Sequence, residues 1–241
     1  WRRALELAAA LVVAALSCAY YAIYGGLAVG VLILVLGRRP IRYWGWLAVS
    51  ALVAGGAVWP VFSAFLQARA ASGAAVLERG SEAAEWSANV SSYLASGAAL
   101  HQWWKAPLWN AQPWVDVLFP GVTVLGLAVA GLFAVRGAGP SRRVAMAYVI
   151  AAGVALWASF GPEAGLYRVL EAVVPGITLL RAPVRLGVVV VFAIAVLAGW
   201  AVARLAQRRR WVVPALVLLV AAELAVFTPE WGWPSWPLRV V

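Results

Sequence analysis

The stretch Leu186–Leu205, LGVVVVFAIAVLAGWAVARL, decides the class of the fold. Its one charged side chain, Arg204, lies next to its last residue. A helix needs about 20 apolar residues to cross the hydrocarbon core of a bilayer. The length and composition of this stretch therefore predict a transmembrane helix.

The whole chain has the same character as this stretch. Of its 241 residues, 65% are hydrophobic and 12% are charged, which lies far outside the composition of water-soluble domains. We predict an all-α fold, a polytopic transmembrane helical bundle that forms one domain over residues 1–241. This composition excludes a soluble enzyme, a disordered tail and a nucleic-acid partner, although the net charge is +10.

The apolar segments of suitable length number about seven. The first two are short and close together, so they form either a tight hairpin or one bent helix. We favour the hairpin, because a straight helix over 4–36 would be about 50 Å long. The predicted spans are Ala4–Ala19, Ala22–Leu36, Tyr43–Leu66, Val117–Val135, Val144–Phe160, Leu186–Leu205 and Trp211–Phe227.

The basic residues predict the orientation of the spans. Lys and Arg near span ends are retained on the cytoplasmic side. With the N-terminus inside, the inner connections hold twelve of the 19 Lys and Arg residues, and the outer segments hold seven of the nine acids. We therefore expect an integral protein of a bacterial inner membrane, with the long loops and the C-terminal tail outside.

The first long outer loop, residues 67–116, is rich in tryptophan. Ser81, followed by Glu82 and Glu85, predicts a short helix that reaches about Leu94 and ends before Gly97. Beyond it, flat aromatic rings alternate with amide and carboxylate groups, a mixture that suits the apolar faces and hydroxyls of a sugar. The other interpretation is an aromatic belt at the membrane interface. The candidate sugar-binding residues are Trp103, Trp104, Trp109, Asn110, Gln112 and Asp116.

The second outer segment, residues 161–185, predicts an amphipathic helix that lies on the outer leaflet, followed by a re-entry segment. Its apolar face would consist of Leu166, Val169, Leu170 and Val173. Arg181 and Arg185 then flank Pro183, and a guanidinium fork fits a phosphate oxyanion well. The alternatives are ordinary contact with lipid headgroups or pairing with the outer acids Glu163, Glu171 or Asp116.

The remaining polar residues offer little catalytic chemistry. Glu223 lies in the seventh predicted span, where an ionisable group needs a partner, and it is either a structural hydrogen-bonded group or a relay. The chain has one Cys, one Met and one His. This inventory argues against a histidine-based triad, a metal centre and a histidine-ligated cofactor. We predict no metal and no cofactor, and the catalytic residues stay unknown.

Four stretches together resemble the C-terminal half of bacterial multi-pass glycosyltransferases of the GT-C superfamily and their uncharacterised relatives. The stretches are Ser17–Tyr24, Ser92–Leu94 with the Trp-rich segment after it, Leu118–Gly121 and Pro175–Gly187. The resemblance implies a membrane enzyme that transfers sugar from a polyprenyl-phosphate carrier on the outer face. It also implies a catalytic carboxylate in the first outer loop of the whole enzyme.

The connection between the first two predicted spans, residues 20–26, contains no acid. The chain begins at Trp1, so we expect it to be part of a longer polypeptide that supplies the catalytic acid. The alternative hypothesis is a non-catalytic membrane subunit of a larger complex, whose partners are other membrane subunits. A transporter is a third possibility, for which Glu223 is the one intramembrane candidate.

Overall fold

The computed structural model describes residues 2–36, 40–71, 83–101, 103, 117–135, 140–174, 177 and 182–225. Every regular element within these ranges is a helix, as the composition predicts. The α-helices are α1 (Arg2–Ser17), α2 (Ala19–Leu36), α3 (Ile41–Ala71), α6 (Val122–Ala134), α7 (Pro140–Ser159), α8 (Leu166–Val173), α9 (Gly187–Arg208) and α10 (Val212–Glu223). Short 3-10 turns are η2 (Ser91–Tyr93), η3 (Ala99–His101), η4 (Pro162–Ala164) and η6 (Pro183–Leu186).

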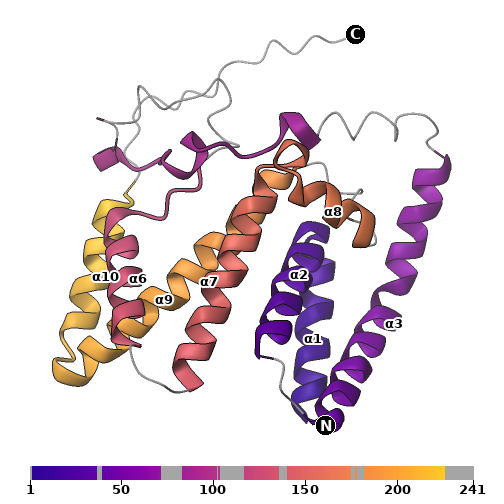
Figure 1. Cartoon of the computed structure of the whole chain (residues 1–241), viewed down its shortest axis with the longest axis horizontal. Coiled ribbons are helices and arrows are strands. Elements are labelled where there is room, and N and C mark those ends of the chain that lie inside the picture. The colour runs from indigo at the N-terminus through magenta and orange to yellow at the C-terminus, as the bar shows by residue number, and fades with distance from the viewer. Residues whose placement is uncertain are drawn as a thin grey trace.

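The long helices run alternately up and down, and each predicted span coincides largely with one of them (Figure 1). The packed pairs are α3 with α1, α1 with α2, α2 with α7, α7 with α9, and α9 with both α6 and α10. The first two helices form an antiparallel hairpin, although Cys18 alone separates them. The hairpin interpretation of the first two segments therefore agrees with the structure.

Helices α6 and α9 approach each other very closely. A Cβ atom added to Gly131 would lie 2.0 Å from the backbone oxygen of Leu197, so no larger residue fits between the two backbones. Ala128, Ala145, Leu197 and Ala198 form a buried cluster around this contact. Small residues allow helix backbones to approach closely, which is how helices associate in lipid, where the hydrophobic effect gives no driving force.

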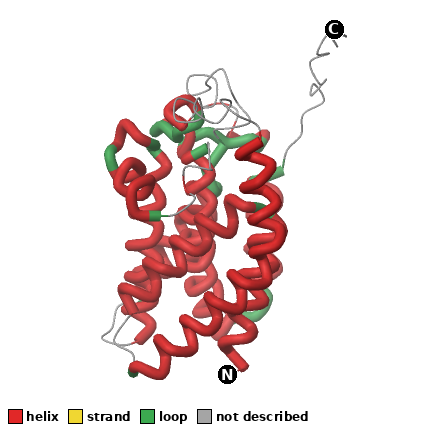
Figure 2. The backbone as a smooth tube through the Cα atoms, turned by 90° about the vertical axis from the view of Figure 1, so that its right-hand side faces the viewer, coloured by secondary structure: helices red, strands yellow, loops and turns green. Residues whose placement is uncertain are grey.

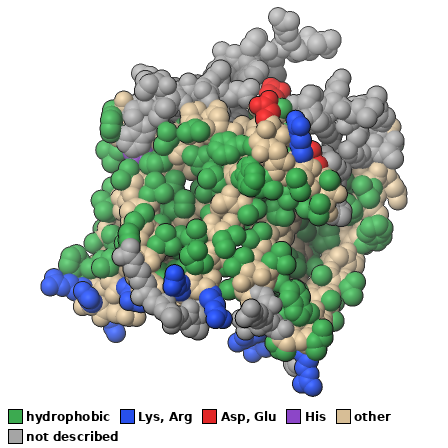
Figure 3. Space-filling model, in the orientation of Figure 1, with side chains coloured by type: hydrophobic (Ala, Val, Ile, Leu, Met, Phe, Trp, Pro, Cys, Tyr) green, Lys and Arg blue, Asp and Glu red, His purple; other side chains and the backbone are tan. Residues whose placement is uncertain are grey.

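The charges divide between the two ends of the bundle. The basic end contains the start of α1, and Figure 3 shows Lys and Arg side chains along it. At the opposite end, which we call the loop end, Figure 3 shows acidic side chains, and Figure 2 shows that most of the loops gather there. The exposed arginines of the basic end are Arg2, Arg3, Arg42, Arg142, Arg143, Arg204, Arg208, Arg209 and Arg210.

Two helical stretches are long and apolar enough to cross a membrane by length and composition. They are Ile41–Ala68 and Pro183–Arg208, with mean hydropathies of 1.8 and 2.6. These stretches support a membrane protein weakly, and seven crossings are not confirmed. In the described residues α6 and α10 contain 13 and 12 residues, so each spans only about 20 Å. The first turn of α1 carries Arg2 and Arg3, and that of α7 carries Arg142 and Arg143.

Residues 83–101, which we call the cap segment, cross the loop end. The predicted helix from Ser81 to Leu94 is wrong in its extent, because the described helical turn ends at Glu85. The backbone groups of Trp86 and Ala88 bond instead to Val184 and Ser159, and Asn89 forms a local turn after them. Its side-chain oxygen accepts hydrogen bonds from the backbone N–H and the hydroxyl of Ser92, at 2.9 and 3.0 Å, and such local bonds compete with helix formation.

The cap segment is held by its backbone to four other parts of the fold. Its hydrogen bonds are Ala88 N to Ser159 O, Val184 N to Trp86 O, Leu118 N to Ser92 O and Ala99 N to Ala225 O, with lengths from 2.8 to 3.1 Å. These bonds connect the ends of α7 and α10 with η6 and with the residues before α6. The cap segment therefore fixes the relative positions of the helix ends on which the candidate site is built.

Candidate functional site at the loop end

Arg185 is the most informative of the predicted site residues. It belongs to η6, the 3-10 turn that leads into α9, and its side chain is exposed. Its guanidinium carbon lies 4.2 Å from the centre of the Tyr20 ring, at the start of α2. A guanidinium over an aromatic face is a cation–π contact, which orients the side chain and leaves its N–H donors available.

The backbone around Arg185 is rigidly held. Pro183, Val184 and Leu186 are buried, and Tyr24 donates a hydrogen bond of 3.0 Å from its hydroxyl to the carbonyl of Ala182. Tyr20 and Tyr24 also pack edge to face, with ring centres 5.8 Å apart. Arg185 is therefore an exposed cation whose backbone is held in place.

No carboxylate forms an ion pair with Arg185 in the part of the chain that the structure describes. Two of the three acids proposed as partners, Glu163 and Glu171, are described and do not contact it in this way. The third, Asp116, lies outside the described residues. A surface cation that pairs with neither described acid retains its capacity to bind an external anion.

The amphipathic helix predicted next to this site is present as α8, with a different inner face. Tyr167 is completely buried, and Leu166 and Leu170 pack against the same core cluster. Val169 and Val173, expected on that face, are 57% and 71% exposed. Burial raises the pKa of the Tyr167 phenol, and the negative charge of Glu171 raises this pKa further, so the hydroxyl stays protonated.

Glu223, an ionisable residue within a predicted span, has hydrogen-bond partners in the structure. One carboxylate oxygen accepts hydrogen bonds from His101 Nε2, at 3.1 Å, and from the backbone N–H of Val122. The other oxygen accepts the N–H of Thr123 at 3.0 Å. The carboxylate therefore caps the N-terminus of α6 from a neighbouring helix, where the helix dipole also favours negative charge.

The glycine before α6 makes this cap possible. Gly121 has φ +99°, a backbone conformation that side chains rarely adopt. A Cβ atom at this position would also lie 3.1 Å from the carboxylate oxygen of Glu223. The stretch Leu118–Gly121, which contributes to the family resemblance, thus ends at the residue that accommodates the Glu223 carboxylate.

His101 extends the cluster to Ser96, whose hydroxyl lies 2.7 Å from Nδ1 of the imidazole. A neutral imidazole with its proton on Nε2 satisfies both contacts, since Ser96 then donates to Nδ1 and Nε2 donates to Glu223. A serine, a histidine and a glutamate are thus connected, an arrangement that the sequence analysis argued against. Because Ser96 and His101 are only 2% and 3% exposed, the arrangement holds the cap segment in place and offers no open nucleophile.

Of the other predicted site residues, Trp103 is the one that lies within the described ranges. Trp103 is 79% exposed, as a residue of an aromatic contact surface would be. Within the described residues, no group of three His, Cys, Asp or Glu side chains is arranged to hold a metal ion. The predicted residues that lie outside the described ranges are Trp104, Trp109, Asn110, Gln112, Asp116 and Arg181.

The stretches that carry the family resemblance meet at the loop end. Tyr20 lies under Arg185, and the backbone N–H of Leu118 donates to the carbonyl of Ser92. The side chain of Leu118 also fills the space in which a Cβ atom of Gly187 would lie. Parts of the sequence that are far apart therefore build one local structure.

Comparison with known proteins adds no family assignment. No protein-family model matches the chain, and neither a curated protein nor a solved structure is similar to it at a significant level. The functional argument therefore rests on the residues and their geometry.

Proposed function

We propose that this chain is the membrane half of a GT-C-like glycosyltransferase and that Arg185 binds the phosphate of a polyprenyl-phosphate sugar. The observation that carries the proposal is the exposed guanidinium on the Tyr20 ring, without an ion pair to a described acid. Transfer breaks the bond between the sugar and the phosphate, so negative charge grows on the phosphate oxygens. A fixed guanidinium stabilises that charge more strongly than the charge of the bound donor.

The orientation of the protein is part of the proposal. The exposed arginines listed for the basic end would face the cytoplasm of a bacterial inner membrane, in agreement with the positive-inside rule. The loop end, with the cap segment and α8, would then face outward. Val169 and Val173, exposed on α8, would contact the acyl chains next to the carrier lipid.

The proposal leaves the catalytic acid unassigned. Glu223 is unsuited to the role, because its two oxygens are already bound by His101, Val122 and Thr123. The Trp-rich segment and Arg181 would contribute the remaining contacts to the sugar, the acceptor and the phosphate. These residues are the next targets for substitution once the role of Arg185 has been tested.

The direct test is the affinity of the full natural polypeptide, in detergent, for a polyprenyl phosphate. A charge-assisted hydrogen bond contributes about 1.5–3 kcal/mol, so Arg185→Gln should weaken binding by about tenfold or more. Arg185→Lys should give an intermediate value, because it keeps the charge and loses the planar fork. Arg168→Gln is the matched control, since Arg168 is an exposed cation on α8 at the same end.

Equal affinities for the wild-type protein and Arg185→Gln would overturn the role of Arg185, and an equal loss in Arg168→Gln would reduce it to a general surface charge.

The orientation is tested separately by single cysteines in a Cys18→Ser background. Cysteine in place of Glu163 should react with an impermeant thiol reagent in intact cells, whereas cysteine in place of Arg142 should not.

The second candidate function is a non-catalytic membrane subunit, and the exposure of α3 favours it. Among the described helices, α3 has its main contacts with α1, and Leu52 and Trp59 are 75% and 61% exposed. A partner subunit would cover this surface. Co-purification of another protein at fixed stoichiometry in mild detergent, lost in Leu52→Ala/Trp59→Ala, would favour this function over the transferase.

A further inference from the structure

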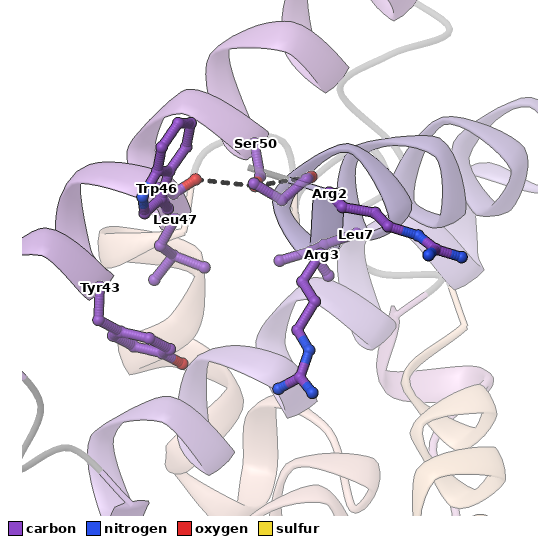
Figure 4. A pocket seen from close by; sticks show the side chains of 8 residues that line it. Arg2, Arg3, Leu7, Tyr43, Trp46, Leu47 and Ser50 are labelled. Atoms are coloured by element: carbon purple, nitrogen blue, oxygen red, sulfur yellow. Dashed lines mark hydrogen bonds between the residues drawn. The ribbon is translucent and has the colours of Figure 1, made fainter.

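A cavity of about 640 Å³ opens between α1 and α3 at the basic end, opposite the proposed transferase site. Figure 4 shows its lining, with Arg3 and Tyr43 at the sides and Leu7 and Leu47 between the two helices. We propose that this cavity binds an anionic glycerophospholipid. The phosphate would lie at Arg3, and the first part of an acyl chain would lie along the two leucines.

Arg3 is the cation that remains available in this cavity. The Nε of its neighbour Arg2 donates to the Glu6 carboxylate at 3.0 Å, so the charge of Arg2 is already partly balanced. Arg3 is exposed and has no ion pair with any acid that the structure describes. Both arginines line the cavity, and Figure 4 shows their side chains extending in different directions from α1.

The floor of the cavity favours a lipid over a soluble anion. Leu7 follows Arg3 by one helical turn, about 6 Å deeper along α1, and Leu47 lies in the corresponding part of α3. Ser50 presents no free hydroxyl, because it is 1% exposed and lies 2.9 Å from the carbonyl of Ala4 and 2.8 Å from that of Trp46. The cavity has a cation at one level and apolar side chains below it. This arrangement fits a lipid, whose phosphate would lie at the cation and whose acyl chain would lie along the apolar side chains.

The surroundings select for a lipid with net negative charge. Arg2 and Arg3 both line the cavity at the start of α1, and a zwitterionic headgroup would bring its own ammonium group next to them. Trp46, which lines the cavity and is 48% exposed, is of the residue type enriched at headgroup depth. Clusters of basic residues next to membrane helices attract anionic lipids by the same electrostatics.

The test measures binding of phosphatidylglycerol to the full polypeptide in neutral detergent, by titration with native mass spectrometry. Arg3→Gln should weaken binding about fivefold. Arg42→Gln is the matched control, because Arg42 is an exposed cation at the same end and does not line the cavity. Its affinity should stay within about twofold of the wild type, because an exposed charge outside the lining acts on the phosphate only through solvent and salt, which screen it.

Two further ligands distinguish a lipid site from a general anion site. Phosphatidylcholine should bind at least about fivefold more weakly than phosphatidylglycerol. Glycerophosphoglycerol, the same headgroup without acyl chains, should bind at least tenfold more weakly, because it cannot bury apolar surface on Leu7 and Leu47. Equal binding of the free headgroup, equal binding of phosphatidylcholine or equal losses in Arg3→Gln and Arg42→Gln would each overturn the proposal.

The result is independent of the transferase proposal, because Arg185 lies at the other end of the bundle. A loss of polyprenyl phosphate binding in Arg185→Gln leaves the expectations for Arg3→Gln unchanged. Both variants replace exposed side chains, so folding is checked by a melting temperature close to that of the wild type. Leu47→Asn provides a second variant, which should weaken binding of the diacyl lipid more than binding of the free headgroup.

Discussion

The bundle consists of two parts that differ in how closely they pack. In the closed half, formed by α6, α7, α9 and α10, Gly131 lies directly on the backbone of Leu197. In the open arm, formed by α1, α2 and α3, 11% of the apolar stretch of α3 is buried, against 39% of the stretch that contains α9 in the closed half. The cavity between α1 and α3 belongs to the open arm as well.

Three charged groups at different places in the bundle also differ in how they are satisfied. Glu223 of the closed half has hydrogen bonds from a side chain and two backbone groups. Arg3 of the open arm and Arg185, which lies against α2 of that arm, have no described ion pair. The comparison teaches that the buried Glu223 positions the structure, whereas the exposed Arg3 and Arg185 present cations to ligands.

Gly131→Ala should disrupt the packing of α6 against α9 in the closed half, and we expect it to have the largest effect on stability. The new methyl group would overlap the backbone oxygen of Leu197, and a backbone atom cannot move aside as a flexible side chain can. We expect a loss of about 3 kcal/mol in the free energy of unfolding. The measurement is equilibrium unfolding of the purified protein in detergent.

Gly126→Ala on the same helix is the control. No atom lies within 4 Å of a Cβ at this position, so the variant should be more stable than the wild type by about 0.5 kcal/mol. A similar loss in both variants would mean that the α6–α9 contact has no special role.

Glu223→Ala should loosen the cap segment, with the second largest effect. It leaves His101 Nε2 and the N–H groups of Val122 and Thr123 without their acceptor, and such a loss costs about 2 kcal/mol. Protection of the amides of residues 96–101 against hydrogen exchange should fall with the stability. Glu163→Ala, at an exposed acid of the same end, should change stability by less than about 0.5 kcal/mol, and an equal loss there would contradict the capping role.

Tyr20→Leu should have the smallest effect on stability and a selective effect on binding. It removes the aromatic face under the Arg185 guanidinium, a contact that contributes about 0.5–1 kcal/mol at exposed sites. We expect polyprenyl phosphate to bind about threefold more weakly. Tyr21→Leu is the control, since Tyr21 is adjacent and 53% exposed. Equal affinity in the two variants would show that the stacking does not position Arg185.

The helices could be predicted from the sequence because long apolar runs have few alternatives to helix. The residues at which the helices begin and end could not be predicted in the same way. The helix predicted to reach Leu94 ends at Glu85, and Asn89 forms a local turn through hydrogen bonds from Ser92. The sequence alone does not reveal whether an Asn side chain accepts such local bonds. The prediction of which residues of α8 face the core was also partly wrong. The large Tyr167 ring is buried, and Val169 and Val173 are therefore on the exposed side of the helix.

The predicted site residues stay a prediction. The two arginines near Pro183 were found from their charge, and the structure describes Arg185 as an exposed cation. The Ser96–His101–Glu223 cluster was missed, because its last two members are 122 positions apart. A signal existed, since Glu223 required a partner and His101 was the one histidine of the chain. Pairing these two residues would have predicted the contact.

The hydrogen bond from Tyr24 to Ala182 has a consequence for how the protein is made. It joins residues separated by 158 positions, so the ribosome must synthesise the described helices α1, α2, α3, α6, α7 and α8 before this contact can form. The bond from Ser50 to Ala4 spans only 46 positions, and α1 can therefore associate with α3 early. We expect biogenesis in two stages, in which the α1–α3 arm assembles first and is joined to the rest when α9 inserts.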